Sequence, residues 1–214
     1  MKNSSSPGSF AFFKAVFPWV LIGLIAAPSL QSQTTPLNDS NFFTARDLWF
    51  SDQDSAIATY GHIKDWNVTG VTSMEEAFMG KATFDDNISG WDVSNVTNMR
   101  RVFRGATSFN QPIGDWNVSS VTNMYATFAG ASSFNQPIGN WDLSSLTNMH
   151  SLFNGASSFN QPIGNWDASK VTSLSWAFWD THAFDQDLSD WNVSSVTDMT
   201  NMFNGNNALS NTNK

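Results

Sequence analysis

A hydrophobic pattern with a period of 25 residues organises the chain from residue 61 to residue 209. An aliphatic residue lies three positions before and five positions after a tryptophan in every repeat, and phenylalanine recurs further on. One unit of 25 residues cannot bury its own apolar face, so such a period predicts coils that stack on one another. We call the residues at one equivalent position of successive repeats a column. The structural tryptophan column consists of Trp66, Trp91, Trp116, Trp141, Trp166 and Trp191.

Each repeat is predicted to contain a short strand, a bend that carries the tryptophan, and a short helix. Phe109 and Ile113 are four residues apart with a polar residue between them, which fits a short extended segment. Met99 and Phe103 have the i, i+4 spacing of one helix face, and Gly105 can end that helix in a left-handed conformation. The expected fold class is therefore an α/β repeat, a solenoid of about six coils of 25 residues over residues 61–209.

Residues 33–60 are predicted to form an N-terminal cap, because the first coil of a stack otherwise exposes its apolar side chains. Asp39 or Ser40 can start a helix there. Residues 210–214 form a polar tail. The side chains near one face of the predicted cap helix are Phe42, Phe43, Ala45, Leu48 and Trp49.

Residues 1–32 have the pattern of a secretory signal peptide. Lys2 and Lys14 precede the apolar run 15–27, which ends near the small residues Ala27 and Ser29. The run is shorter than the ~20 residues that a spanning helix needs. We expect a secreted or cell-surface protein with a cleaved signal, and an uncleaved signal anchor stays open as the alternative route to a membrane.

The amino-acid composition excludes several classes of partner and of metal or cofactor site. Asp and Glu number 18 against 10 Lys and Arg, so the net charge is −8, which disfavours nucleic acid as a partner. The absence of cysteine excludes disulfides, thiolate zinc sites and iron–sulfur clusters. No cofactor is expected.

The sequence motif of the repeat resembles that of a known family. The segment 91–99 (WDVSNVTNM), then Phe103, then the segment 109–113 (FNQPI) resemble the BspA-like leucine-rich-repeat surface proteins. They are most similar to the 25-residue variant first described in mycoplasma lipoproteins, and the resemblance covers residues 60–209. It implies an LRR-like solenoid that is secreted or attached to a surface, with relatives that bind host or matrix proteins. Lipid attachment does not follow, because the cysteine that would carry the lipid is missing.

No catalytic or metal-binding residue is assigned. His62, His150 and His182 fall at different positions of the repeat, so stacking does not gather them in one column. Asp185, Asp187 and Asp190, which would face Asp85 and Asp86 four coils away, could hold Ca²⁺ or form a carboxylate pair. Asp85 and Asp185 occupy the column that other repeats fill with asparagine, however, which favours a ladder of side chains that bond the backbone.

The favoured function is a non-catalytic extracellular or cell-surface binding or adhesion solenoid, with a protein or a glycan as ligand. The alternatives are a carbohydrate-active β-solenoid enzyme that uses acidic residues, and a purely structural component of an envelope or matrix. The candidate ligand contacts are Trp176 and Trp179, because the core does not require aromatic side chains at these two positions. Their rings could instead fold over the neighbouring coil. The sequence does not indicate an oligomeric state.

Overall fold

The computed structural model describes residues 35–210. These residues all belong to one compact unit, residues 32–214. The predicted signal peptide, together with most of the polar tail, lies outside the described residues. No helix within residues 35–210 combines the length and the hydrophobicity needed to cross a membrane.

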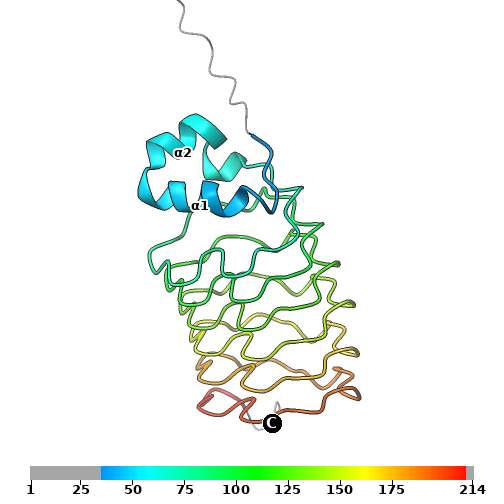
Figure 1. Cartoon of the computed structure of the whole chain (residues 1–214). Helices are drawn as coiled ribbons and strands as arrows, with labels where there is room; N and C mark the ends of the chain where they lie inside the picture. Colours follow the sequence, from blue (N-terminus) through cyan, green and yellow to red (C-terminus); the bar gives the residue numbers. More distant parts are fainter. Residues whose placement is uncertain (1–34, 211–214) are drawn as a thin grey trace, which may run out of the picture. The chain divides into compact units, whose positions relative to one another are not determined.

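Two short helices precede the repeats, in the segment where the sequence predicted a cap (Figure 1). Helix α1 spans Phe42–Ser51 and helix α2 spans Gln53–Tyr60, followed by a single 3-10 turn, η1, at Ile63–Asp65. Asp52 separates the two helices, and its carboxylate accepts a hydrogen bond from the N–H of Ser55 at the start of α2. The buried side chains of α1 pack on the start of the stack, Trp49 against Trp66 and Phe42 against Trp91, so the helices cover that end of the stack.

The residue expected to start the first helix has a different role. The N-cap of α1 is Asn41, and no side chain bonds the N-terminus of this helix, so the assignment of that role to Asp39 or Ser40 is wrong. The Asp39 carboxylate instead accepts hydrogen bonds from the hydroxyl of Thr72 (2.6 Å) and the N–H of Thr72 (2.8 Å). Asp39 therefore connects the segment before α1 to the first coil. Its carboxylate bonds Thr72 of that coil and does not cap the helix next to it in the sequence.

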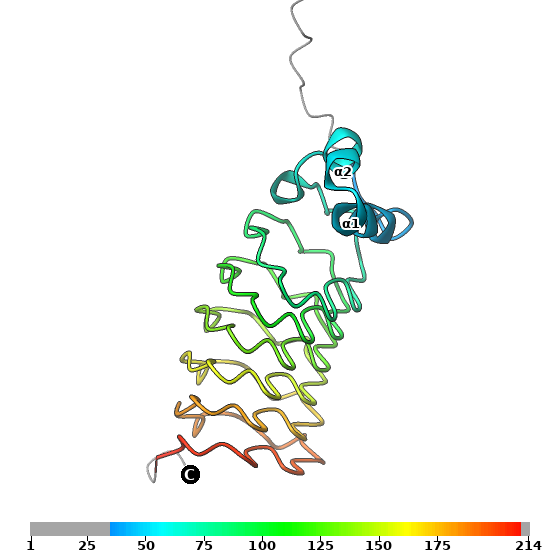
Figure 2. The same cartoon turned by 90° about the vertical axis from the view of Figure 1, so that its left-hand side faces the viewer.

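After η1 the chain winds through stacked coils, each joined to the next by parallel bridges between equivalent residues (Figures 1 and 2). The stack contains turns and isolated bridges, and neither an α-helix nor an extended strand occurs between residue 66 and residue 210. The bridges connect Ser73, Asn98, Asn123, Asn148, Ser173 and Asp198 in order.

The predicted helical segment of each repeat is a ribbon of turns, so that expectation is wrong. Arg101 has φ 56° and Gly105 has φ 71°, both in the left-handed region. Every second N–H donates to a carbonyl of the next coil, as Arg101 does to Tyr125 (2.9 Å), and the intervening N–H groups bond within the turn, as Arg104 does to Arg101 (3.2 Å). The neighbouring coil thus takes the donors that an i→i−4 helix would need, and a segment this short cannot nucleate a helix alone.

The predicted strand at 109–113 is also absent, because Pro112 has no N–H to donate and side chains replace the carbonyls of a ladder. The N–H of Asn110 donates to the Asp85 carboxylate (2.8 Å), and the N–H of Asn135 donates to the Asn110 side chain (2.9 Å). The same contact continues through Asn160 and Asp185 to Ser210. The predicted side-chain ladder is confirmed, and it includes Asp85 and Asp185, two of the carboxylates considered for calcium.

The core is built from columns that stack along the coils. The tryptophan column faces the interior, and its six residues are 3–7% exposed. Phenylalanine rings stack in the same way, with 5.7 Å between the ring centroids of Phe78 and Phe103 and 7° between their planes. Burial of such rings in register gives every coil the same shape.

Candidate binding surface

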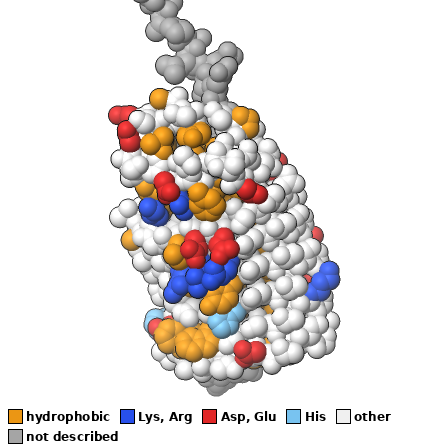
Figure 3. All heavy atoms as spheres, viewed as in Figure 1, with side chains coloured by type: hydrophobic (Ala, Val, Ile, Leu, Met, Phe, Trp, Pro, Cys, Tyr) orange, Lys and Arg blue, Asp and Glu red, His pale blue; other side chains and the backbone are white. Residues whose placement is uncertain are grey.

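The repeats stop resembling one another along one strip of the surface. We define the variable strip as the side chains at positions 75, 76 and 79 and at the equivalent positions of each later repeat. Met74, Ala77 and Phe78 beside these positions are buried, whereas Glu75, Glu76 and Met79 are partly or fully exposed. In later repeats three small residues at these positions, Ala126, Ser151 and Ser175, are themselves buried. On the face drawn in Figure 3, charged, histidine and hydrophobic side chains gather along a band across the coils. The strip continues through residues 100, 101 and 104; 125, 126 and 129; 150, 151 and 154; 175, 176 and 179; and 200, 201 and 204.

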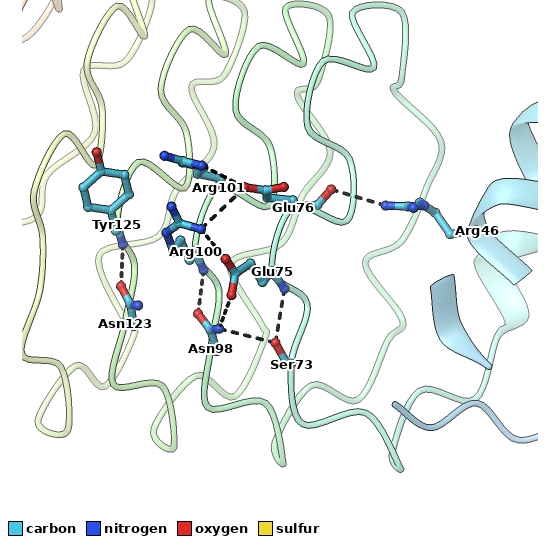
Figure 4. A network of polar contacts seen from close by, with 9 residues as sticks. All are labelled: Arg46, Ser73, Glu75, Glu76, Asn98, Arg100, Arg101, Asn123 and Tyr125. Atoms are coloured by element: carbon cyan, nitrogen blue, oxygen red, sulfur yellow. Dashed lines mark hydrogen bonds and ion pairs between the residues drawn. The ribbon is translucent and has the colours of Figure 1, made fainter. Parts of the chain in front are cut away.

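Two acidic and two basic side chains form a network at the end of the strip nearer the cap (Figure 4). Arg101 bonds the Glu76 carboxylate at 2.8 Å, and Arg100 contacts the Glu75 carboxylate. The hydrogen bond from Arg100 holds the pKa of Glu75 below its usual value, and the hydrogen bond with Glu76 raises the pKa of Arg101. These groups lie near the surface, where solvent screens ion pairs, so the pairs contribute little to stability. The network neutralises two of the arginines of the strip.

Tyr125 continues the strip from this network. The guanidinium carbons of Arg100 and Arg101, in the preceding coil, each lie 5.4 Å from the centroid of its ring. His150, in the following coil, stacks on the ring at 4.9 Å with 3° between the planes. These contacts hold the Tyr125 ring between neighbours, so its outer edge is the part left for a ligand.

A hollow of about 360 Å³ lies beside Tyr125 in the middle of the strip. It exists because the central coil carries Ala126 and Ala129, while larger side chains stand at the equivalent positions of the coils on either side. Of its polar side chains, Arg104, Ser151 and Asn154 make no side-chain hydrogen bond or ion pair with the part of the chain that the structure describes. The residues that line the hollow are Arg104, Gly105, Tyr125, Ala126, Ala129, Gly130, Ser151, Asn154 and Gly155.

Trp176 and Trp179 lie on the same strip, one coil beyond Ser151 and Asn154. Trp176 is 36% exposed, Trp179 is half-buried, and their ring centroids are 5.5 Å apart. They share a face although no helix is present, because the turn ribbon places Trp176 in a left-handed conformation (φ 60°). The N–H of Gly155 donates to the carbonyl of Trp179 (2.8 Å), which ties the tryptophan coil to the coil that borders the hollow.

The three histidines lie in three separate environments. His62 packs edge-on against Trp49 with 5.0 Å between ring centroids, and His150 belongs to the strip. His182 has Nε2 3.5 Å from the carboxylate of Asp180, the residue that replaces the glycine of its column and shares its left-handed conformation (φ 57°). No group of three or more His, Asp or Glu side chains suited to a metal occurs within residues 35–210.

The sequence predicted Trp176 and Trp179 as ligand contacts, but it did not predict the hollow beside Tyr125. The available signal was a run of small residues, Ala126 and Ala129, in a column where the preceding repeat has Arg101 and Arg104. The pattern within a single repeat does not show that small side chains here lie between larger ones in the neighbouring coils, and so does not predict a depression.

Comparison with protein families places the repeats in a known group. Residues 47–150 and residues 113–214 each match the family described as Mycoplasma protein of unknown function, DUF285. Neither a search of curated proteins nor a search of solved structures found a match. The two matched segments overlap, and together they contain every repeat of the tryptophan column. The chain belongs to the DUF285 family.

Proposed function

We propose that this protein is a non-catalytic binding or adhesion solenoid that acts outside the cell or at its surface, and that the variable strip contacts its ligand. The proposed ligand is a protein or a glycan. The BspA-like leucine-rich-repeat identity and the secretion of the chain belong to the same proposal.

The observation that carries the proposal is the contrast between the strip and the rest of the coil. The core columns and the side-chain ladder repeat the same residue types in coil after coil. Along the strip, the position equivalent to Glu75 is filled by arginine, tyrosine, histidine, serine and threonine in turn. Stacking does not require this variety, and solenoids present their extended lateral faces to partners.

Four carboxylates of the described chain have structural partners, which favours binding over catalysis. Glu75 and Glu76 are paired with arginines, and Asp85 bonds the backbone of the next coil. The Asp92 carboxylate accepts a hydrogen bond from the N–H of Ser94, and Ser94 lowers the pKa of this group, which keeps it ionised. Each has a structural partner, whereas a general acid in a glycosidase needs a raised pKa.

The test is capture of ligands from extracellular extracts and from a glycan panel by the purified chain and by the double variant Trp176→Ala, Trp179→Ala. Two aromatic anchors side by side on an exposed face are typical of binding sites, so the double variant should lose a captured ligand by more than tenfold in affinity.

The matched control is Ile57→Ala, which removes an exposed hydrophobic side chain from α2, away from the strip. A ligand that the control retains and the double variant loses supports the proposal. Ligands captured equally by both variants, or no capture by the unmodified chain, would overturn the assignment of the strip.

A further inference from the structure

We propose that the hollow between Arg104 and Asn154 binds the carboxylate of an acidic sugar residue. The inference rests on the proposed function, because it assigns a ligand class to the same strip.

One unpaired positive charge, that of Arg104, lies at one side of the hollow. Within residues 35–210 there are seven Lys and Arg residues, and Arg100, Arg101 and Arg104 are three of them. Glu75 and Glu76 take up the charge of the first two. Arg104 is exposed and has no ion-pair partner among the described residues, so its guanidinium fork is free for a planar anion such as a carboxylate.

The other lining groups suit hydroxyls. Ser151 is only 8% exposed and Asn154 stands two coils from Arg104, and neither side chain has a hydrogen-bond partner within the described chain. Gly105 and Gly130 have no side chains, so the surface of the hollow is not raised at these two positions. A volume of about 360 Å³ is at the small end of ligand sites and fits one or two sugar rings.

An acidic peptide fits the same surface less well. Peptides commonly bind by adding main-chain hydrogen bonds to a free edge. Here the backbone along the hollow is already paired between coils, since the N–H of Gly105 donates to the carbonyl of Ala129 (2.7 Å) and the N–H of Gly130 to that of Asn154 (2.7 Å). Beyond the hollow, the exposed ring of Trp176, with the half-buried Trp179 beside it, can stack on the C–H face of a second sugar.

The experiment measures binding of oligosaccharides that contain glucuronic, galacturonic or N-acetylneuraminic acid by calorimetry. Each is paired with a counterpart in which the carboxyl groups are reduced to alcohols. The unmodified chain should bind at least one acidic oligosaccharide more than tenfold more tightly than its reduced counterpart. Arg104→Gln should remove this difference, since it removes the guanidinium and keeps a polar side chain.

Lys170→Gln is the matched control, because it makes the same charge change at an exposed basic residue outside the strip and should retain the preference for the acid. Ala129→Leu fills the hollow without changing charge, and should weaken binding of the acidic oligosaccharide more than tenfold with an unchanged melting temperature. A peptide rich in glutamate serves as the competing class.

Equal binding of acidic and reduced oligosaccharides, an Arg104→Gln variant that keeps the preference, or binding of the peptide alone would each overturn the inference. If a neutral glycan or a protein then still depends on Trp176 and Trp179, the proposed function stands without it. If no ligand depends on the strip, both fail.

Discussion

The indole Nε1 of Trp141 donates a hydrogen bond of 3.2 Å to the backbone carbonyl of Ile113 in the preceding coil. The same contact recurs at Trp91, where the distance to the Ile63 carbonyl is 2.8 Å. From Trp91 onward, each tryptophan of the column therefore fills the core and also bonds a carbonyl of the preceding coil, whereas Trp66 bonds the Gly61 carbonyl. This dual role explains why the column keeps tryptophan instead of another large apolar residue.

Replacement of Trp141 separates the two contributions. Trp141→Ala is expected to lower the free energy of unfolding by about 3 to 5 kcal/mol, because it leaves a cavity in a packed interior. Trp141→Phe keeps most of the volume and leaves the Ile113 carbonyl without its donor, at a cost of about 1 to 3 kcal/mol. Urea denaturation of both variants is the measurement. A stability unchanged in either variant would contradict the role of the column.

Two glycines should respond to alanine for different reasons. An added Cβ at Gly139 would lie 2.3 Å from the carbonyl oxygen of Pro162 in the next coil, and a backbone atom cannot rotate away. At Gly130 the nearest atom is 3.6 Å away, and only the left-handed φ of 71° opposes a side chain. We expect Gly139→Ala to cost about 3 kcal/mol and Gly130→Ala about 1 kcal/mol. Thermal melts of the two variants test the order, and the reverse order would refute the close approach at Gly139.

The tryptophan pair on the strip should behave unlike the tryptophan column. Trp176 is exposed, so the double variant Trp176→Ala, Trp179→Ala should reduce the melting temperature far less than Trp141→Ala does. Differential scanning calorimetry of the two variants under one set of conditions gives the comparison. A drop as large as that of Trp141→Ala would mean that the pair packs on the stack and is not a ligand contact.

Stability should fall in acid. The hydrogen bond from the Thr72 hydroxyl lowers the pKa of Asp39, and the hydrogen bond from Ser55 lowers the pKa of Asp52. A carboxyl whose pKa is lower in the folded state stabilises the fold at a pH above its unfolded pKa of ~3.9, and this contribution is lost as the pH falls below that value. The melting temperature should therefore decrease between about pH 4 and pH 2.

The Asp39→Asn variant tests one contributor to this acid response. It should be less stable than the unmodified chain at pH 7 and should lose less stability on acidification, because the ionised partner of Thr72 is already missing. A parallel decrease in both proteins would show that Asp39 does not contribute to the pH dependence.

Processing of the N-terminus is the remaining prediction. The basic start, the short apolar run and the small residues Ala27 and Ser29 predict signal cleavage. Intact-mass analysis of protein recovered outside the cell should show a chain that begins between Leu30 and Gln33. Recovery of the full-length chain in the membrane fraction would favour the uncleaved anchor.

The sequence by itself determined the repeat length, the columns that fill the core and the side-chain ladder. These features depend on spacing along the chain, and a strict period repeats that spacing in every coil. The ladder was readable because Asp85 and Asn110 share one position of the repeat and offer the same acceptor oxygen.

Tertiary structure decided the backbone between those columns and the shape of the strip. Met99 and Phe103 point inward in a helix and in a turn ribbon alike, so their spacing could not distinguish the two. The choice was made by hydrogen bonds to a coil about 25 residues away, as between Arg101 and Tyr125. The hollow likewise requires side chains from three coils, with Arg104 and Asn154 brought to either side of Ala129 only when the coils stack.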